Sequence, residues 1–235
     1  MWNQIKPHLP KDANAAVVDL GCGTGKWAAR IAKSGYPITC VDISPKMIDQ
    51  ARRTLGFVDP SSEKACFVRA DLCDLSELPA GAFRLALAMG DPIGCTESPV
   101  KAMRQIQRIL APDGILVATF DNRLAAVDYY LQGGDIDALR RFLSDGVTHW
   151  LTKDAAERFP IHTFSPEDVR KLCTGSGFEL VDMVGCTVLP IRQHRHLLED
   201  AATGRQLARM ERSLHRIPSA IGRASHLLAM FRPLK

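Results

Sequence analysis

Short apolar runs alternate along the first half of the chain with segments in which apolar residues recur every three or four positions. A run of five to seven residues of this kind is typical of a buried strand, and the three-to-four spacing is typical of a helix with one face in the core. Strands that alternate with helices predict right-handed βαβ units and a mostly parallel sheet. The predicted strands are 15–20, 37–41, 65–70, 83–89 and 115–120, and the predicted helices between them are 26–33, 45–55 and 100–110.

This alternation is interrupted between residues 121 and 164. Residues 124–131 and 136–143 have the spacing of two short helices joined at Gly133-Gly134. The stretch His149-Trp150-Leu151 follows, and an extended segment precedes Phe164. Because this connection is much longer than an ordinary one between a strand and a helix, we expect a lid or substrate-binding insertion at 121–164.

The strand and helix pattern resumes after the insertion. Ser165-Pro166 combines a natural N-cap with a proline suited to the first helical turn. The remaining predicted elements are a sixth strand at 178–188, a long amphipathic helix at about 194–215 and a last strand at 224–231. The sequence therefore predicts an α/β protein with a seven-stranded, mostly parallel sheet flanked by helices. We expect residues 1–235 to form one domain, with the insertion placed after strand 5.

Composition agrees with one large domain that stays outside the membrane. The chain has 235 residues, of which 46% are hydrophobic and 24% charged, enough for a full core. Its first residues lack a basic region followed by an apolar core, and no stretch approaches the roughly 18 apolar residues of a membrane span. The seven cysteines are scattered without a C-x-x-C pair. We expect a soluble, cytoplasmic protein with reduced thiols.

Positive charge is concentrated near the C-terminus. From Arg192 onward the chain has nine Lys and Arg residues against three acids, although the whole chain has a net charge of only +4. This segment could meet an anionic substrate or nucleic acid. However, Arg205, Arg209 and Arg212 recur at helical spacing, which is typical of a solvated helix face.

The most informative stretch is residues 17–25, with the sequence VVDLGCGTG. A strand that runs into a glycine-rich turn and then a helix lets a ligand lie against bare backbone and exposed amides. The phosphate-binding pattern G-x-x-x-x-G-K-[ST] fails, since it requires a glycine at Leu20 and a hydroxyl at Trp27. The dinucleotide pattern G-x-G-x-x-G fails as well, since its third glycine falls on Lys26.

The remaining pattern, an acid and then Leu-Gly-x-Gly-x-Gly, resembles the first motif of class I S-adenosylmethionine-dependent methyltransferases of the small-molecule type. Asp42, in Val41-Asp42-Ile43-Ser44, stands where that family places the acid that holds both ribose hydroxyls. Asp71 stands where the family contacts the adenine amino group, and residues 110–116 are similar to its turn into strand 5. The resemblance covers residues 15–120 and implies a Rossmann-like fold.

Physical reasoning supports the same placement. The carboxyl ends of parallel strands lie on one edge of the sheet, where open α/β sheets bind ligands, so we expect Asp19, Asp42 and Asp71 to converge there. Asp19 would face the ammonium group of the ligand or order the turn, and Asp71 could instead be only a turn former. The resemblance implies S-adenosyl-L-methionine as cofactor and S-adenosyl-L-homocysteine as product. The cofactor contacts that it implies are Asp19, Gly21, Cys22, Gly23, Gly25, Asp42, Ile43, Met47, Asp71, Leu72 and Met89.

The acceptor side is less well defined by the sequence. Methyl transfer from a sulfonium needs alignment and, for a hydroxyl or thiol acceptor, one base. The candidate bases are His149, His162 and Asp91, and the candidate substrate contacts are Asp91, Tyr129, Tyr130 and His162. His226 falls within a predicted strand, where we expect a structural role. No metal site is expected.

Three functions remain open. The first is a methyltransferase that acts on an O, N or S nucleophile of a small metabolite, as a monomer or homodimer. The second is an RNA methyltransferase that uses the basic C-terminal segment, which we regard as the weaker hypothesis because few aromatic residues lie among its arginines. The absence of an Asn-Pro-Pro-Tyr motif after strand 4 and of a Pro-Cys motif also argues against methylation of base amino groups or of base C5. The third is a cofactor-binding regulatory module without catalysis.

Overall fold

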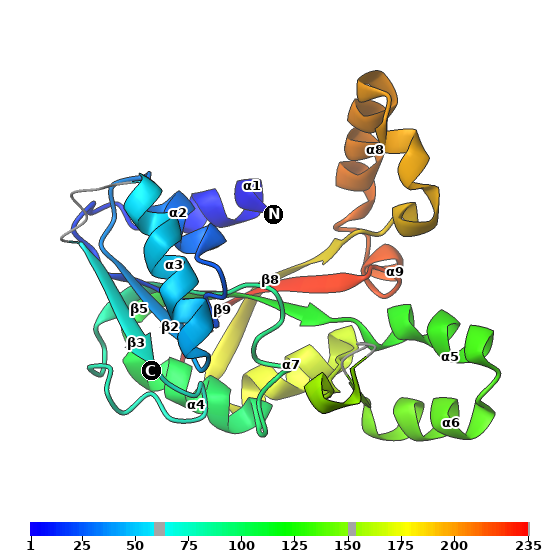
Figure 1. The fold of residues 1–235 in the computed structure, drawn as a ribbon, viewed down its shortest axis with the longest axis horizontal. Coiled ribbons are helices and arrows are strands. Elements are labelled where there is room, and N and C mark those ends of the chain that lie inside the picture. Colours follow the sequence, from blue (N-terminus) through cyan, green and yellow to red (C-terminus); the bar gives the residue numbers. More distant parts are fainter. Residues whose placement is uncertain (59–63, 150–153, 235) are drawn as a thin grey trace.

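A computed structural model describes residues 1–58, 64–149 and 154–234 and centres on one seven-stranded sheet (Figure 1). Across the sheet the strands are β3 (Ala65–Arg69), β2 (Ile38–Asp42), β1 (Val17–Leu20), β4 (Phe83–Ala88), β5 (Leu110–Asp121), β9 (His226–Pro233) and β8 (Phe178–Cys186). The first five are parallel to one another, whereas β9 is antiparallel to both β5 and β8. This arrangement confirms the predicted fold class.

Helices cover both faces of the sheet (Figure 1). One face carries α1 (Trp2–Ile5), which the 3-10 turn η1 (Lys6–His8) follows, together with α2 (Lys26–Ala32) and α3 (Pro45–Val58); the other carries α4 (Pro99–Ile109) and α7 (Pro166–Gly175). Along β4, Leu85 packs into the core on the first face, and its neighbour Ala86 packs into the core on the second. A strand buried on both faces needs an uninterrupted apolar run, and such runs in the sequence predict these strands.

The segment between β5 and α7 forms an arm that projects from the sheet (Figure 1). It contains the 3-10 turn η2 (Arg123–Ala126), α5 (Val127–Gly133), α6 (Ile136–Asp145), the hairpin of β6 (Val147–His149) and β7 (Pro160–His162), and the 3-10 turn η3 (Ala155–Glu157). Gly134 ends α5 in the left-handed conformation, and the Asp135 side chain caps α6. The two predicted helices are confirmed. Trp150 and Leu151 lie outside the described residues.

A second arm replaces the predicted continuous helix at 194–215. The structure has the 3-10 segment η4 (Ile191–Leu198), α8 (Ala201–Leu214) and α9 (Pro218–Ile221). The prediction is wrong because the chain breaks twice. His194 has non-helical backbone angles, and the side chain of Asp200 caps a new helix by accepting from the Thr203 amide at 2.7 Å. In Figure 1 the two arms extend from the same side of the sheet.

The start of β5 also differs from the prediction. The sequence predicts a turn at 112–114 with the strand after it, but β5 begins at Leu110, which pairs with Phe83. The register then shifts, so that Leu85 pairs with Ile115. Residues 111–114 therefore form an irregularity inside β5, like an enlarged β-bulge. The strand pairs with β4 both before and after this irregularity.

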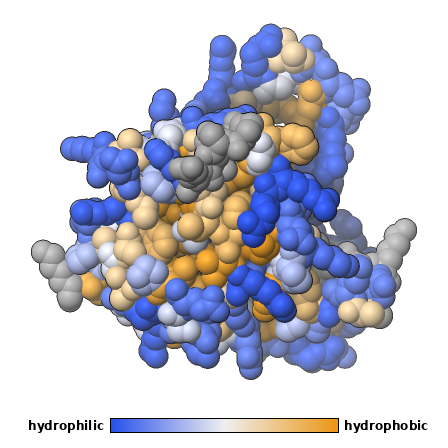
Figure 2. All heavy atoms as spheres, turned by 60° about the vertical axis from the view of Figure 1, so that its left-hand side comes forward, coloured by the Kyte–Doolittle hydropathy of each residue, from blue (hydrophilic) through white to orange (hydrophobic). Residues whose placement is uncertain are grey.

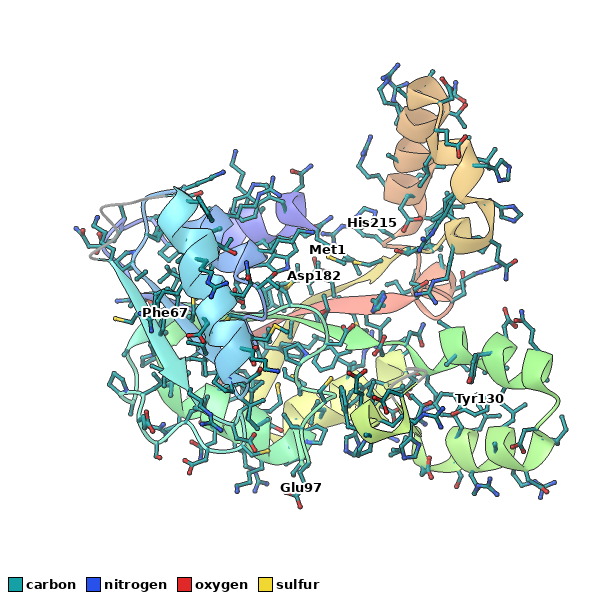
Figure 3. All side chains as sticks on the ribbon, viewed as in Figure 1. Met1, Phe67, Glu97, Tyr130, Asp182 and His215 are labelled. Carbon is teal, nitrogen blue, oxygen red and sulfur yellow. The ribbon has the colours of Figure 1, made fainter. Side chains whose placement is uncertain are left out.

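The N-terminal helix is fastened to the base of the C-terminal arm. Figure 3 shows Met1, Asp182 and His215 close together there. Gln4 Nε2 lies 3.0 Å from His215 Nε2, and Arg216 forms an ion pair with Asp182 at 2.8 Å. These contacts join the N-terminal helix and β8 to the end of α8.

The remaining surface has two features of note. The β3 edge of the sheet comes forward in Figure 2, where apolar residues gather in the middle of the face inside a hydrophilic rim. Phe57 at the end of α3 is 89% exposed. Among the described helices, none combines the length and the apolar character needed to cross a bilayer.

Candidate functional site

The glycine turn after β1 is built for close approach. Gly21, Gly23 and Gly25 all have positive φ angles, of 65°, 52° and 79°. A Cβ on Gly21 would lie 2.4 Å from the Cβ of Pro92, and nothing lies within 4 Å of the corresponding position on Gly23. Gly21 therefore lets the loop after β4 touch the turn, while Gly23 borders open space.

Asp42 at the end of β2 holds this turn in place. Its Oδ2 accepts from the Gly23 amide and its Oδ1 from the Ser44 amide, each at 2.9 Å. A carboxylate offers about four acceptor positions, so both oxygens can still accept from another donor. Asp42 therefore keeps an acceptor position for a ligand hydroxyl on each oxygen.

Asp19 at the end of β1 is directed toward α2. Its side chain is buried, and Oδ2 accepts from the Ala28 amide at 3.0 Å. Burial raises the pKa of Asp19 to about 7. The hydrogen bond from Ala28 lowers this pKa, and the nearby Asp42 carboxylate raises it further. Of the two roles predicted for Asp19, the geometry favours that of ordering the turn.

The other predicted cofactor residues divide into exposed and buried groups. Ile43 and Met47 are 62% and 40% exposed beside Asp42, and Asp71 is exposed with its Oδ1 on the Cys73 amide at 2.8 Å. By contrast, Leu72 belongs to the core, as do Cys22 and Met89. An open glycine, a carboxylate with a free acceptor position on each oxygen and exposed apolar side chains together fit S-adenosylmethionine.

A second cluster lies at the ends of β4 and β5. Asp91, just after β4, has a left-handed backbone with φ of 65°, and Thr119 Oγ1 accepts from the amides of Gly90 and Asp91 at 2.8 and 3.0 Å. His226 Nδ1 lies 3.0 Å from Asp91 Oδ2 and 3.3 Å from Asp121 Oδ1. Since a carboxylate can only accept, Nδ1 carries the proton.

The electrostatics of this cluster follow from its burial. Asp91 is 8% exposed, and its Oδ1 has no hydrogen-bond partner within the described part of the chain. Burial raises the pKa of Asp121 to about 6, and Asp91 adds to that shift. The hydrogen bond to Asp91 raises the pKa of His226 above its ordinary value. Two carboxylates around one imidazole make it a stronger base than a free histidine.

The same cluster is where a cation could be held. Ligand atoms of Asp91, Asp121 and His226 lie within 4.8 Å of one another, and the described residues contain no other group of three of this kind. Its closest contact, between Nδ1 and Oδ2 at 3.0 Å, has the length of an N–H···O hydrogen bond. In this structure the cluster is held together by the proton on His226 Nδ1, which faces both carboxylates.

The remaining acceptor-side candidates lie on the first arm. Tyr130 sits between α5 and α6 (Figure 3), where it stacks on Phe142 and its hydroxyl lies 2.8 Å from Thr148 Oγ1. Tyr129 is 55% exposed, and His149 is exposed on β6. The His162 amide donates to Gly94 O at 2.8 Å, so the arm touches the loop after Asp91. The structure thus brings His162 near that loop and uses Tyr130 in packing.

Sequence reasoning missed Asp121 and expected only a structural role for His226. Asp121 ends its strand at the same sheet edge as Asp19 and Asp42, which was a usable signal. His226 could be placed only by knowing that β9 pairs with β5 in a register that sets His226 opposite Asp121. Its partner Asp91 is 135 residues away.

Comparison with known proteins agrees with the geometry of the turn. Residues 17–114 match the family model described as a methyltransferase domain. The chain is 30% identical over 122 residues to the uncharacterized methyltransferase At1g78140 of Arabidopsis thaliana, a match that covers 50% of this chain and 34% of that protein. The chain spans less than half the length of this protein and of the Bacillus subtilis relatives YqeM and YodH.

Longer matches extend past the family model. The chain is 25% identical over 185 residues to the ubiquinone biosynthesis O-methyltransferase of Xanthomonas axonopodis pv. citri, covering 79% of this chain and 71% of that one. The structure of an S-adenosylmethionine-dependent methyltransferase from Methanosarcina mazei superposes with a TM-score of 0.68 at 16% identity, covering 100% and 98% of the two chains. Residues 17–114, which contain the cofactor motifs, match a methyltransferase domain, and along its whole length the chain has the fold of an S-adenosylmethionine-dependent methyltransferase.

Proposed function

We propose that this chain transfers a methyl group from S-adenosylmethionine to an O, N or S nucleophile of a small molecule. The observation that carries the proposal is the contact between Gly21 and Pro92. It places the turn suited to the cofactor directly beside the loop of Asp91, a residue with an unpartnered buried carboxylate oxygen. A donor site and an acceptor site that touch are what a transfer reaction requires.

On the cofactor side, Asp42 binds the ribose diol while its amide contacts keep the turn closed. Exposed Ile43 and Met47 offer an apolar surface to the adenine ring, and Asp71 offers an acceptor to its amino group. The bound cofactor supplies a methyl group already activated by a sulfonium. The protein therefore contributes mainly alignment and exclusion of water, of which alignment can be worth roughly 7–11 kcal/mol.

On the acceptor side, a small molecule fits better than RNA. The first arm reaches the Asp91 loop through His162 and Gly94, so it can cover a compact substrate. Among the basic residues of the second arm, Arg216 already forms an ion pair with Asp182 of the same chain, so its charge is partly neutralised for an RNA phosphate. The name of the Xanthomonas relative, an O-methyltransferase, points in the same direction. A cytoplasmic setting suits the seven free cysteines.

Calorimetry with S-adenosylhomocysteine tests the cofactor half of this proposal. We expect Asp42→Ala to weaken binding by about 100-fold, because it removes both the ribose contact and the anchor of the Gly23 amide. The matched control is Asp12→Ala. Asp12 also accepts a backbone amide, that of Asn14 at 2.9 Å, but it precedes β1 and so lies away from the carboxyl edge.

The result that would overturn the ribose assignment is an unchanged dissociation constant for Asp42→Ala. A folded wild-type chain that binds no S-adenosylhomocysteine would refute the proposed function as a whole. Binding without any transfer to small hydroxyl, amine or thiol compounds would favour the regulatory-module alternative.

A further inference from the structure

The cluster of Asp91, Asp121 and His226 combines an unusual backbone conformation with a buried carboxylate oxygen that lacks a donor among the described residues. Asp91 keeps a left-handed backbone although it is not glycine, and more than nine-tenths of its surface is buried. Its Oδ1 is left without a donor among the described residues. A buried acceptor without a partner is costly, and a hydrogen-bond donor on a bound molecule would remove that cost.

The two carboxylates fix which face of His226 is free. Both approach Nδ1, at 3.0 and 3.3 Å, so the proton stays on Nδ1 and the lone pair stays on Nε2. The His226 side chain is 34% exposed, whereas the Asp91 side chain beneath it is 11% exposed. The imidazole therefore offers an accessible basic nitrogen, held in orientation from behind.

The cluster that holds this nitrogen is linked to the cofactor turn through the loop after β4. Thr119 fixes the amides of Gly90 and Asp91, Pro92 of the same loop packs on Gly21, and Asp91 holds His226. Each step of this chain is a direct contact. The basic nitrogen is thus connected to the turn through one short, rigid loop.

We propose that His226 is the general base of the reaction and that the acceptor is a hydroxyl group that keeps its proton at neutral pH. The inference rests on the proposed methyl transfer. The acceptor O–H proton moves to His226 Nε2, the O–CH₃ bond forms, and the S–CH₃ bond breaks. The products are a methyl ether, neutral S-adenosylhomocysteine and a His226 imidazolium stabilised by Asp91 and Asp121.

The need for such a base distinguishes among acceptors. A neutral amine attacks through its lone pair and can lose its proton afterwards, and a thiol ionises readily. A hydroxyl gains most from a base placed beside it, typically about 10²–10⁴-fold in rate. Asp91 and Asp121 act here as positioning residues, since they reach the acceptor through His226.

Other charged and titratable groups face His226 as well. Arg192 on η4 lowers the pKa of His226 and of Asp121, opposing the carboxylates. Cys186 lies opposite His226 on β8, and Cys95 lies near Asp91 and Asp121; burial raises the pKa of each thiol to about 11, so both stay neutral near pH 7. The carboxylates are therefore the groups that set the basicity of His226.

The test uses His226→Gln in the full chain, with His196→Gln on the exposed surface of η4 as the control. Both variants should bind S-adenosylhomocysteine like the wild type, which separates this inference from the proposed function. Initial rates are measured at about pH 8, where 4-methoxyphenol keeps its proton and 4-nitrophenol is largely ionised. We expect His226→Gln to lower kcat by about 10²–10⁴-fold for the first acceptor and far less for the second.

Several results would overturn the proposal. One is an equal loss for both phenols, which would indicate a merely structural role. Another is a wild-type enzyme that binds S-adenosylhomocysteine but methylates neither phenol. Loss of wild-type activity on addition of EDTA would assign the cluster to a cation instead.

A second measurement needs no acceptor. Nitrogen-15 NMR of the histidine side chains should find His226 protonated on Nδ1, and Asp91→Asn should lower its pKa. A His226 protonated on Nε2 when neutral would refute the base assignment, because no lone pair would then face the acceptor.

Discussion

The two halves of the candidate site are built in different ways. On the cofactor side, Asp19, Asp42 and Asp71 each accept a backbone amide, and the farthest of these donors in sequence is Gly23, 19 residues from Asp42. On the acceptor side, the defining contact joins Asp91 to His226 across 135 residues. The first half is a local feature of β-strand ends, and the second exists only once β9 has paired with β5.

Because of this difference, substitutions in the two halves should have different effects. A change on the cofactor side acts on the glycine turn and on binding, whereas a change on the acceptor side acts on proton transfer. The contact between Gly21 and Pro92 is the point at which the two meet.

Gly21→Ala should have the largest effect, because it disturbs both the cofactor side and the acceptor side of the candidate site. The new Cβ would overlap Pro92 at 2.4 Å, and φ of 65° is strained for any residue with a side chain. We expect a loss of about 3 kcal/mol in the free energy of unfolding, measured in urea, and loss of cofactor binding.

Gly35→Ala is the matched control for that change. Gly35 also has a positive φ, of 91°, but nothing lies within 4 Å of its Cβ position. It should cost only the backbone strain, about 1 kcal/mol, and leave cofactor binding unchanged. Equal losses in the two variants would mean that the contact with Pro92 does not join the halves.

Asp19→Asn should stabilise the protein at neutral and higher pH. The folded-state pKa of Asp19 is raised to about 7, so ionisation opposes folding at neutral pH. The variant and the wild type should be equally stable near pH 4, and the variant should gain as pH rises, reaching about 2 kcal/mol above pH 7, half of what three pKa units correspond to.

Asparagine can still accept from the Ala28 amide, so the turn should persist in Asp19→Asn. Thermal unfolding at a series of pH values measures the effect. A variant that is less stable than the wild type at pH 8 would contradict the raised pKa.

Tyr130→Phe tests the arm rather than either half. It removes the contact of the hydroxyl with Thr148 Oγ1 but keeps the stacking on Phe142. The expected loss is about 1 kcal/mol in stability, with cofactor binding unchanged. A strong rise in KM for the acceptor would restore Tyr130 as a substrate contact.

The smallest effect is expected for Arg205→Ala combined with Arg209→Ala. Both residues are exposed on α8. Neither stability nor S-adenosylhomocysteine binding should change by more than about 0.5 kcal/mol. A filter assay with RNA supplies the sharper comparison, since salt-sensitive binding that these substitutions abolish would support the RNA alternative.

The sequence by itself determined the sheet, the glycine turn and the acids of the cofactor side, because buried parallel strands need continuous apolar runs and the turn needs glycines at fixed positions. It could not determine the break at Asp200 or the role of His226. The helix breaks because the Asp200 side chain caps a new helix, although the helical spacing of apolar residues continues across the break. The position of His226 beside Asp121 depends on the register of an antiparallel strand. Only the tertiary structure brought His226 to Asp91, since pairing across 135 residues leaves no local pattern in the chain.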